Sequence, residues 1–322
     1  MHDITNPKKE FIPITIANGD GCGPEIMESI LCILMEAGAR IRVELIEVGE
    51  KLYAKNYISG IAEDTLQSIE RTGILLKAPI IRPLDNDNYK DLSDTLRDVM
   101  SLYANMVFFT SYPVGFNNLD INCIIISDNS QQNCEKLIKF AFEFAIKNNL
   151  KKVLCLLEED TQDTNKIFHD SFLEIAKEYT QTTSNVAISR SFKVSDTTLF
   201  DMIITTKAYK AKLINDISEI TVFPIISYSA DIGDYYSLFE VCHNAKKEIA
   251  NLDLVNPSCL LHSTNNMLKH IGQQEIALVI ERAWKKTIKD GVHTEDIYNQ
   301  AISTKKVGTK EFTQEIIKRI RN

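Results

Sequence analysis

The stretch IPITIANGDGCGPEIMESIL, residues 12–31, predicts a buried strand, a turn that contains three glycines and the beginning of a helix. Residues 11–17 form a β-branched apolar run, which is typical of a central strand. Pro24 favours the first turn of the following helix, and Gly38 predicts its end. The glycines lack both the GxGxxG spacing of a dinucleotide-binding loop and the Gly-Lys-Ser/Thr ending of a P-loop. The turn is therefore not predicted to hold a phosphate.

The composition of the 322 residues is that of a globular chain long enough for two domains. The formal net charge of −8 spreads over both halves, which argues against a nucleic-acid or membrane partner because either would need a basic patch. The seven cysteines are scattered and include no CxxC pair, which indicates thiols in a reducing compartment. No apolar segment has the length of a signal peptide or a membrane span. The sequence therefore predicts a cytoplasmic protein.

Strand-like and helix-like segments alternate along the chain. Apolar or alternating runs predict strands at 41–48, 121–127, 151–157 and 199–206. Apolar residues at helical spacing predict helices at 63–70, 134–149, 170–179, 207–221 and 274–291. This alternation predicts an α/β protein whose sheet is connected by crossover helices.

Two of these helices carry apolar faces that the sequence assigns to packing. The last helix is expected to turn five residues toward the core: Ile276, Val279, Ile280, Ala283 and Ile288. Gly291 is expected to cap it. The helix at 207–221 carries an apolar stripe made of Leu213, Ile214, Ile217 and Ile220.

Four segments together resemble the isocitrate/3-isopropylmalate dehydrogenase family. They are ITIANGDGCGPEI, GILLKAPI, FEVCHNAKKEIANLDLVNPSCLL (239–261) and AWKKTIKDGVHTEDIY (283–298). Within the family the chain is most similar to the isocitrate dehydrogenases of rickettsia-like alphaproteobacteria, without their long C-terminal extension. The resemblance is strong over 11–105 and 228–312 and thin between these segments.

The resemblance implies an α/β fold with two domains around a central cleft. The large domain, on the cofactor side, is expected to combine 1–105 with 229–322, so it is discontinuous in sequence. The small domain, 106–228, is expected to mediate dimerisation with a shortened clasp arm. In the family, the substrate, a divalent metal and NAD(P) meet in the cleft.

The family's metal-binding positions carry no carboxylate in this chain. Ala211 and Asn215 stand where the family has two aspartates on one helical face, and Lys207 and Lys210 replace the nearby Asn and Gly. A third aspartate, given in the family by the partner subunit, aligns with Ala187. Because a hard cation needs oxygen ligands, the sequence predicts no metal site.

The family's proton-transfer groups are also missing. Thr161 aligns with the catalytic lysine, and Lys166 follows several residues too late. The catalytic tyrosine belongs to a stretch that is deleted after SDNSQQN, residues 127–133. No catalytic residue is therefore predicted.

Only a remnant of the substrate-binding residues is present. The resemblance assigns Lys77, Ser93 and Arg97 to the substrate side of the cleft, with Ser93 at a family asparagine. The other two arginines that would hold a tricarboxylate align with Val107 and Ser127. Losing charge-assisted pairs worth about 1.5–3 kcal/mol each would cut the affinity for such a substrate by orders of magnitude.

The cofactor-binding residues are similarly incomplete. His243 and Asn256 stand where the family contacts adenine, and Glu248 stands where NAD-using members bind the ribose. The small flexible loop between them has become Asn-Ala-Lys-Lys at 244–247, and bulky residues occupy 81–88. We expect no bound cofactor.

Several of these residues also have a simpler interpretation. His243 is either a structural histidine or a ligand contact, and Arg97 is either a surface residue or an anion contact. Lys207, Lys210 and Lys212 form either a solvated face or an anion-binding patch in the cleft. Three further histidines lack the spacing of metal ligands and are interpreted as structural or surface residues: His262, His270 and His293.

The sequence therefore predicts a pseudoenzyme of the NAD(P)-dependent isocitrate dehydrogenases. It would act as a regulatory or scaffold partner of an active paralogue, or bind an anionic metabolite, as a homodimer or hetero-oligomer assembled through small-domain helices that include 207–221. The competing hypothesis is an active NAD(P)-dependent decarboxylating 2-hydroxyacid dehydrogenase with altered substrate or metal use, which would need NAD(P) and Mg²⁺ or Mn²⁺. A third hypothesis is a decaying gene without a selected role.

Overall fold

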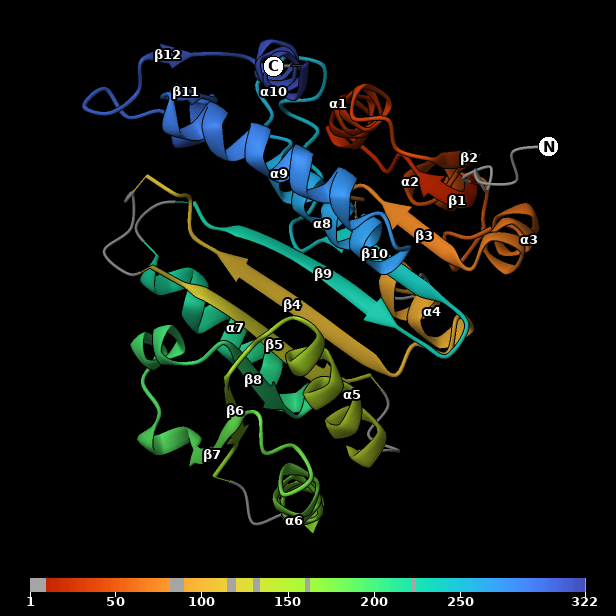
Figure 1. Ribbon diagram of the computed structural model, residues 1–322. Helices are drawn as coiled ribbons and strands as arrows, with labels where there is room; N and C mark the ends of the chain where they lie inside the picture. The colour runs from red at the N-terminus through yellow and green to blue at the C-terminus, as the bar shows by residue number, and fades with distance from the viewer. Residues whose placement is uncertain are drawn as a thin grey trace, which may run out of the picture.

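The computed structural model describes residues 10–81, 90–114, 120–129, 134–159, 163–221 and 224–321. One ten-stranded sheet runs through them, with helices on both faces (Figure 1). Its strands are β1 (Ile12–Ala17), β2 (Ile41–Ile46), β3 (Ile74–Lys77), β4 (Ala104–Thr110), β5 (Asn122–Asp128), β6 (Lys152–Leu157), β7 (Thr183–Ile188), β8 (Met202–Thr205), β9 (Ile226–Ile232) and β10 (Ser237–Val241).

The helices are α1 (Gly23–Glu36), α2 (Glu50–Tyr53), α3 (Glu63–Thr72), α4 (Leu92–Val99), α5 (Cys134–Lys147), α6 (Asp163–Ala176), α7 (Lys207–Ile220), α8 (Ser258–His270), α9 (Gln274–Lys289) and α10 (Thr309–Arg321). Three short 3-10 segments are η1 (Ser189–Ser191), η2 (Val194–Leu199) and η3 (Glu295–Ile297). A separate parallel pair consists of β11 (Val292–His293) and β12 (Lys305–Lys306). Within the described ranges, no helix has both the length and the apolar character that crossing a membrane requires.

The strand order is β2-β1-β3-β10-β9-β4-β5-β8-β6-β7. β2, β1, β3 and β10 form one parallel set, and β5, β8, β6 and β7 form another. β9 and β4 join the two sets through three antiparallel pairings. The predicted α/β class is therefore confirmed. The expected domain boundaries, at residues 105/106 and 228/229, fall inside β4 and β9.

The strand–turn–helix unit predicted from residues 12–31 is present as β1 and α1. Pro24 stands in the first turn of α1, as predicted. Gly19 has φ +69°, and a Cβ atom there would lie 2.1 Å from the Pro79 carbonyl oxygen. The amide of Asp20 donates to that same oxygen at 2.9 Å. The turn therefore needs glycine because it passes directly against the backbone after β3.

The central strands present alternate residues to opposite faces of the sheet. On one face, Met106 and Phe108 of β4 join a core that includes α1, α5, α8, α9 and α10. On the other face, Val107 and Phe109 pack with α7. A smaller core beneath β1, β3 and β10 packs against α3 and α4. β4 therefore contributes residues to two separate cores, one on each face of the sheet, and different helices cover the two faces.

The apolar stripe of α7 packs inside its own chain. Leu213 and Ile217 are fully buried against residues of β4, β5 and β8, and Ile214 packs partly against them. Only Ile220, 37% exposed, is left at the surface. Leu213 and Ile217 therefore complete the core of the sheet and cannot form the expected dimer contact, whereas the contact expected of Ile214 and Ile220 stays a prediction.

Helix α9 buries a slightly different face from the predicted one. Ile280, Ala283 and Ile288 are buried as predicted, but Val279 is 37% exposed. Trp284 is buried on that face. Gly291, with φ +77°, follows the helix end as predicted.

Candidate functional site

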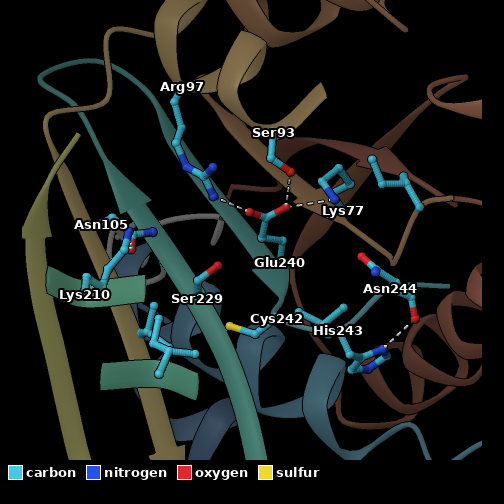
Figure 2. A pocket seen from close by; sticks show the side chains of 14 residues that line it. Lys77, Ser93, Arg97, Asn105, Lys210, Ser229, Glu240, Cys242, His243 and Asn244 are labelled. Carbon is cyan, nitrogen blue, oxygen red and sulfur yellow. Dashed lines mark hydrogen bonds and ion pairs between the residues drawn. The ribbon is translucent and has the colours of Figure 1, made fainter. Parts of the chain in front are cut away.

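A cavity of about 190 Å³ lies where β3, α4 and β10 meet β4, β9 and α7 (Figure 2). The structure brings Lys77, Ser93 and Arg97 together in its lining, as the sequence predicted for a cleft. His243 lies at the same cavity. The other lining residues used below are Asn105, Val107, Lys210, Ser229 and Glu240.

Glu240 of β10 is the centre of a buried charge cluster in this cavity. Its Oε2 atom lies 2.8 Å from Lys77 Nζ, and its Oε1 accepts a hydrogen bond from Arg97 Nη2 at 2.8 Å. Ser93 Oγ donates to Oε2 at 3.3 Å. Burial raises the pKa of Glu240, but Lys77 and Arg97 outweigh it and hold the pKa below its ordinary value. The carboxylate is therefore ionised and paired on both oxygens.

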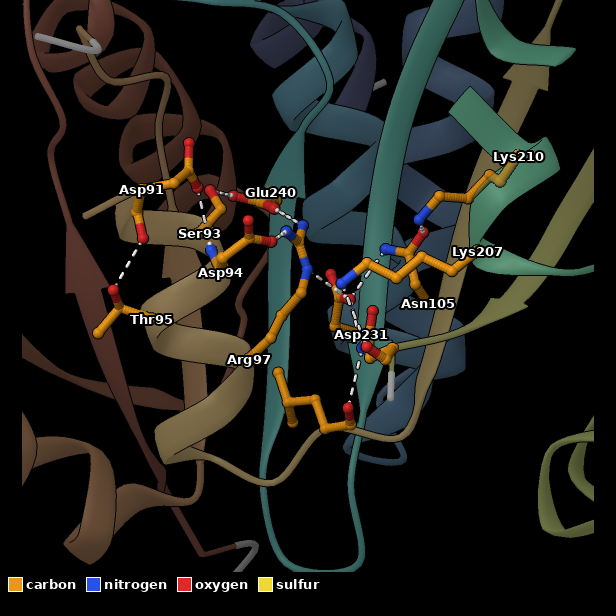
Figure 3. Close-up of polar contacts among 12 residues, drawn as sticks. Asp91, Ser93, Asp94, Thr95, Arg97, Asn105, Lys207, Lys210, Asp231 and Glu240 are labelled. Carbon is orange, nitrogen blue, oxygen red and sulfur yellow. Dashed lines mark hydrogen bonds and ion pairs between the residues drawn. The ribbon is translucent and has the colours of Figure 1, made fainter. Parts of the chain in front are cut away.

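Asp231 of β9 forms a second buried centre next to Glu240 (Figure 3). It is 0% exposed, and its Oδ1 accepts from Arg97 Nε at 3.0 Å, from Asn105 Nδ2 at 2.8 Å and from Asn129 Nδ2 at 3.2 Å. Its Oδ2 has no hydrogen-bond partner in the described part of the chain. Asn105 faces Asp231 directly in the β4–β9 register.

Arg97 is therefore bound by the protein's own carboxylates. Burial lowers the pKa of its guanidinium, but Asp231 and Glu240 outweigh burial, and the net shift is upward. A third contact, to Asp94, spans 3.3 Å at the surface. Arg97 is thus neither a simple surface residue nor a guanidinium free to receive an anion.

Lys210 of α7 differs from the other cations of the cavity. Its Nζ donates to Asn105 Oδ1 at 2.7 Å, and it makes no ion pair with any described residue. Desolvation lowers the pKa of Lys210, Arg97 and Lys207 lower it further, and Asp231 opposes this. Of the three lysines considered together in the sequence, Lys207 and Lys212 are exposed, whereas Lys210 reaches the cavity.

The residues of α7 do not fit a divalent cation. Ala211 and Asn215 are exposed and offer no carboxylate, and the nearby lysine is positively charged. Ala187 lies on β7, the last strand of the sheet. Among the residues that the structure describes, no three His, Cys, Asp or Glu side chains gather as metal ligands. Thr161, at the expected lysine position, lies outside the described residues.

The predicted cofactor residues are not brought together as a set. His243 lines the cavity, but Glu248 is exposed and does not. Asn256 is engaged within the chain: its Nδ2 donates to Tyr112 Oη at 3.0 Å and to Asp296 Oδ2 at 3.1 Å. Of residues 81–88, all but Ile81 lie outside the described ranges.

The loop at 244–247 packs against the turn after β1. The amide of Ala245 donates to Ile80 O at 3.1 Å, and the amide of Lys246 donates to Cys22 Sγ at 3.4 Å. A Cβ atom on Gly21 would lie 2.9 Å from Lys246 O. Lys247 forms an ion pair with Glu50. This loop therefore acts as part of the protein framework.

Sequence reasoning missed Glu240 and Asp231, which organise the site. Glu240 interrupts the largely apolar strand SLFEV, and Asp231 lies between Ala230 and Ile232 in ISYSADI. Because an acidic residue is rarely fully buried without a partner, such an interruption of a strand could have indicated a buried ion pair.

Comparisons with known proteins agree on the relationship. The isocitrate/isopropylmalate dehydrogenase family model matches residues 13–126 and 119–316. The isocitrate dehydrogenase (NADP) of Rickettsia bellii is 46% identical over 341 aligned positions, which cover 97% of this chain and 70% of that protein. A Dictyostelium discoideum protein, named as a regulatory subunit of mitochondrial NAD isocitrate dehydrogenase, is 27% identical, with 94% of this chain and 89% of that protein covered. A Thermus thermophilus crystal structure superposes with a TM-score of 0.85 at 26% identity, covering 96% of this chain and 68% of that one.

Proposed function

This chain belongs to the isocitrate/isopropylmalate dehydrogenase family, and from that premise we propose that it binds a small carboxylate in the cleft without oxidising it. The observation that carries the proposal is Lys210, whose ammonium reaches the cavity without an ion-pair partner in the described chain. The cavity's other charges, Lys77, Arg97 and Glu240, already satisfy one another. One unpaired ammonium suits one carboxylate group better than a tricarboxylate.

The loss of oxidation is supported by the groups around the cavity. Oxidative decarboxylation in this family needs a divalent cation, but α7 offers Ala211 and Asn215 where carboxylates are needed. A lysine ammonium beside that position would repel a cation. The large domain (1–105 with 229–322) and the small domain (106–228) would then act as two halves of a binding protein.

A dehydrogenase assay tests this proposal directly. We expect no formation of reduced nicotinamide when the purified chain is incubated with isocitrate, Mg²⁺ or Mn²⁺ and either NAD⁺ or NADP⁺. The Rickettsia bellii relative, named as an NADP enzyme, serves as the positive control under the same conditions. Turnover by this chain would contradict the proposal and favour an active dehydrogenase that uses NAD(P) with an altered metal site.

Carboxylate binding should depend on the protonation of Lys210. Binding needs the ammonium, so it is complete below the pKa of Lys210 and is lost as pH rises through it. Because this pKa is lowered, the loss should begin at a lower pH than an ordinary lysine would give. Isothermal titration with acetate and succinate between neutral and alkaline pH measures it.

The matched variants for this titration lie on the same helix. Lys210→Met should weaken carboxylate binding by about 10- to 100-fold, the worth of one charge-assisted hydrogen bond. Lys212→Met removes an equal charge from an exposed position and should leave the affinity unchanged. Equal affinities of the two variants would assign the binding to another site.

A regulatory role is the second candidate. The Dictyostelium relative is named as a regulatory subunit, so this family contains a member with that description. We propose that the chain forms a homodimer or assembles with an active paralogue in the cytoplasm, through small-domain surfaces other than the buried stripe of α7. All seven thiols are unpaired, which supports a reducing compartment.

A further inference from the structure

Two adjoining cavities lie on the opposite side of β4 from the cleft. Their volumes are about 400 Å³ and 510 Å³, and Phe144, Asn148, Asn266 and Lys269 line both. We call them together the reverse-face groove. In Figure 1, β9 and β4 run between α5 and the pair α8 and α9, and all three helices pack on the same face of the sheet. The groove and the cleft share no lining residue. Alternate residues of β4 point to opposite faces, so Asn105 lines the cleft while Met106 and Phe108 line the groove.

A series of five rings lines the 400 Å³ cavity of the groove. Phe144 lies 6.4 Å from Phe108, which stacks on Tyr228 with ring centroids 4.7 Å apart and planes 1° apart. Tyr228 lies 5.9 Å from the ring of His262, and His262 meets Trp284 edge-to-face at 4.5 Å. All five residues line this cavity. These aromatic side chains favour a planar ring as the ligand, because a planar ring can stack on them.

Buried polar atoms on α8 stand beside these rings without partners. On the residues that line the 400 Å³ cavity these atoms are His262 Nε2, Asn265 Oδ1 and Asn266 Nδ2, and no described residue forms a hydrogen bond with them. Burial lowers the pKa of His262 to about 4, so its ring is neutral at physiological pH. A buried polar atom without a partner is unfavourable, and in native proteins such atoms ask for a specific explanation. A ligand that presents both a hydrogen-bond donor and an acceptor would provide partners for these atoms.

Both lysines that line the 400 Å³ cavity are paired within the protein. Glu281 pairs with Lys285 at 2.7 Å and with Lys269 at 3.5 Å. Neither lysine is therefore left as an obvious receptor for an anion, which separates this groove from the Lys210 cleft. The recognised part of the ligand should be uncharged.

We propose that the reverse-face groove binds a planar heteroaromatic ring with an amide-type edge, of the nucleobase or nucleoside class. The ring would lie against the aromatic wall, and its edge would pair with Asn265 and Asn266. An aliphatic ligand would leave the amides unpaired, and a simple anion in the 400 Å³ cavity would meet only lysines that are already paired with Glu281. This inference does not rest on the function proposed for the cleft.

Trp284 is the single tryptophan of the chain and lines the groove, so its fluorescence reports on this site alone among the cavities described. The whole chain is titrated with adenosine, guanosine, cytidine and uridine at up to low-millimolar concentration. At least one nucleoside is expected to change the fluorescence saturably. Linear changes with all four, as collisional quenching gives, would overturn the proposal.

Three variants identify the face at which a nucleoside binds. Asn265→Leu keeps a similar volume but removes the amide, and it should weaken binding at least about tenfold without lowering the melting temperature, since it removes an unpaired polar atom. Asn266→Ala, at a half-buried position, should also weaken binding and covers the case in which the first variant fails to fold. His243→Ala alters the cleft and should leave the titration unchanged. Retained binding in both asparagine variants, or loss only in His243→Ala, would overturn the assignment.

Discussion

The Glu240→Gln variant should lose about 3–5 kcal/mol of the free energy of unfolding, because removing one partner leaves buried charge uncompensated. Lys77 is 2% exposed and has Glu240 as its ion-pair partner at 2.8 Å. Arg97 would keep Asp231 and Asp94 but lose its contact with Glu240. Urea unfolding followed by circular dichroism at neutral pH measures the loss.

Two comparisons separate charge from shape in this experiment. Glu47→Gln removes a carboxylate from exposed pairs with Lys51 and Lys55 and should cost less than about 1 kcal/mol. The double variant Lys77→Met with Glu240→Gln should recover part of the stability, since the unpaired ammonium is gone. If Glu240→Gln lowered the free energy of unfolding no more than Glu47→Gln does, the buried ion pairs of Glu240 would not stabilise the fold as their distances indicate.

The Gly19→Ala variant should lose about 2–5 kcal/mol, from left-handed backbone strain together with a steric clash. The added methyl carbon would lie 2.1 Å from Pro79 O, which belongs to backbone and cannot rotate away. The turn after β1 and the segment after β3 would have to separate. Because Asp20 also binds that oxygen, the separation would disturb the cleft side of the sheet.

Gly38→Ala is the matched control for that variant. Gly38 has φ +74°, close to the +69° of Gly19, but a Cβ atom there meets nothing within 4 Å. Its replacement should therefore show the backbone strain alone, about 1–2 kcal/mol. Thermal or urea unfolding of the two variants side by side isolates the clash, and equal losses would show that the contact with Pro79 relaxes freely.

Local patterns predicted much of the fold because strands and helices leave periodic signals. The run at 11–17 became β1, and the helix expected at 134–149 became α5 (Cys134–Lys147). The sequence did not predict β4, whose residues ANMVFFT are almost all buried and so show no alternation. The order of the strands in the sheet could not be predicted from local patterns either, since it depends on pairings between segments that are distant in the sequence.

The candidate site was predicted in part for the same reason. Lys77, Ser93 and Arg97 were grouped through a family resemblance and do meet in one cavity. Their acidic partners lie far along the chain: Arg97 is 143 residues from Glu240 and 134 from Asp231. No local pattern carries that pairing. The groove behind β4 was missed too, because His262 was interpreted as structural and its unpaired neighbours show only in three dimensions.

The strand order has a consequence for how this chain is made. β3 takes β10 as its neighbour, and α1 packs against α10, where Arg321 meets Glu36 across 285 residues of sequence. Loop closure over such separations is slow and entropically unfavourable. During synthesis the first three strands therefore emerge with the edge of β3 still unpaired, while β5, β6, β7 and β8 can pair among themselves. The half of the molecule that starts first is the half that finishes last, and until β10 arrives its open edge is the part of the nascent chain most in need of protection from other strands.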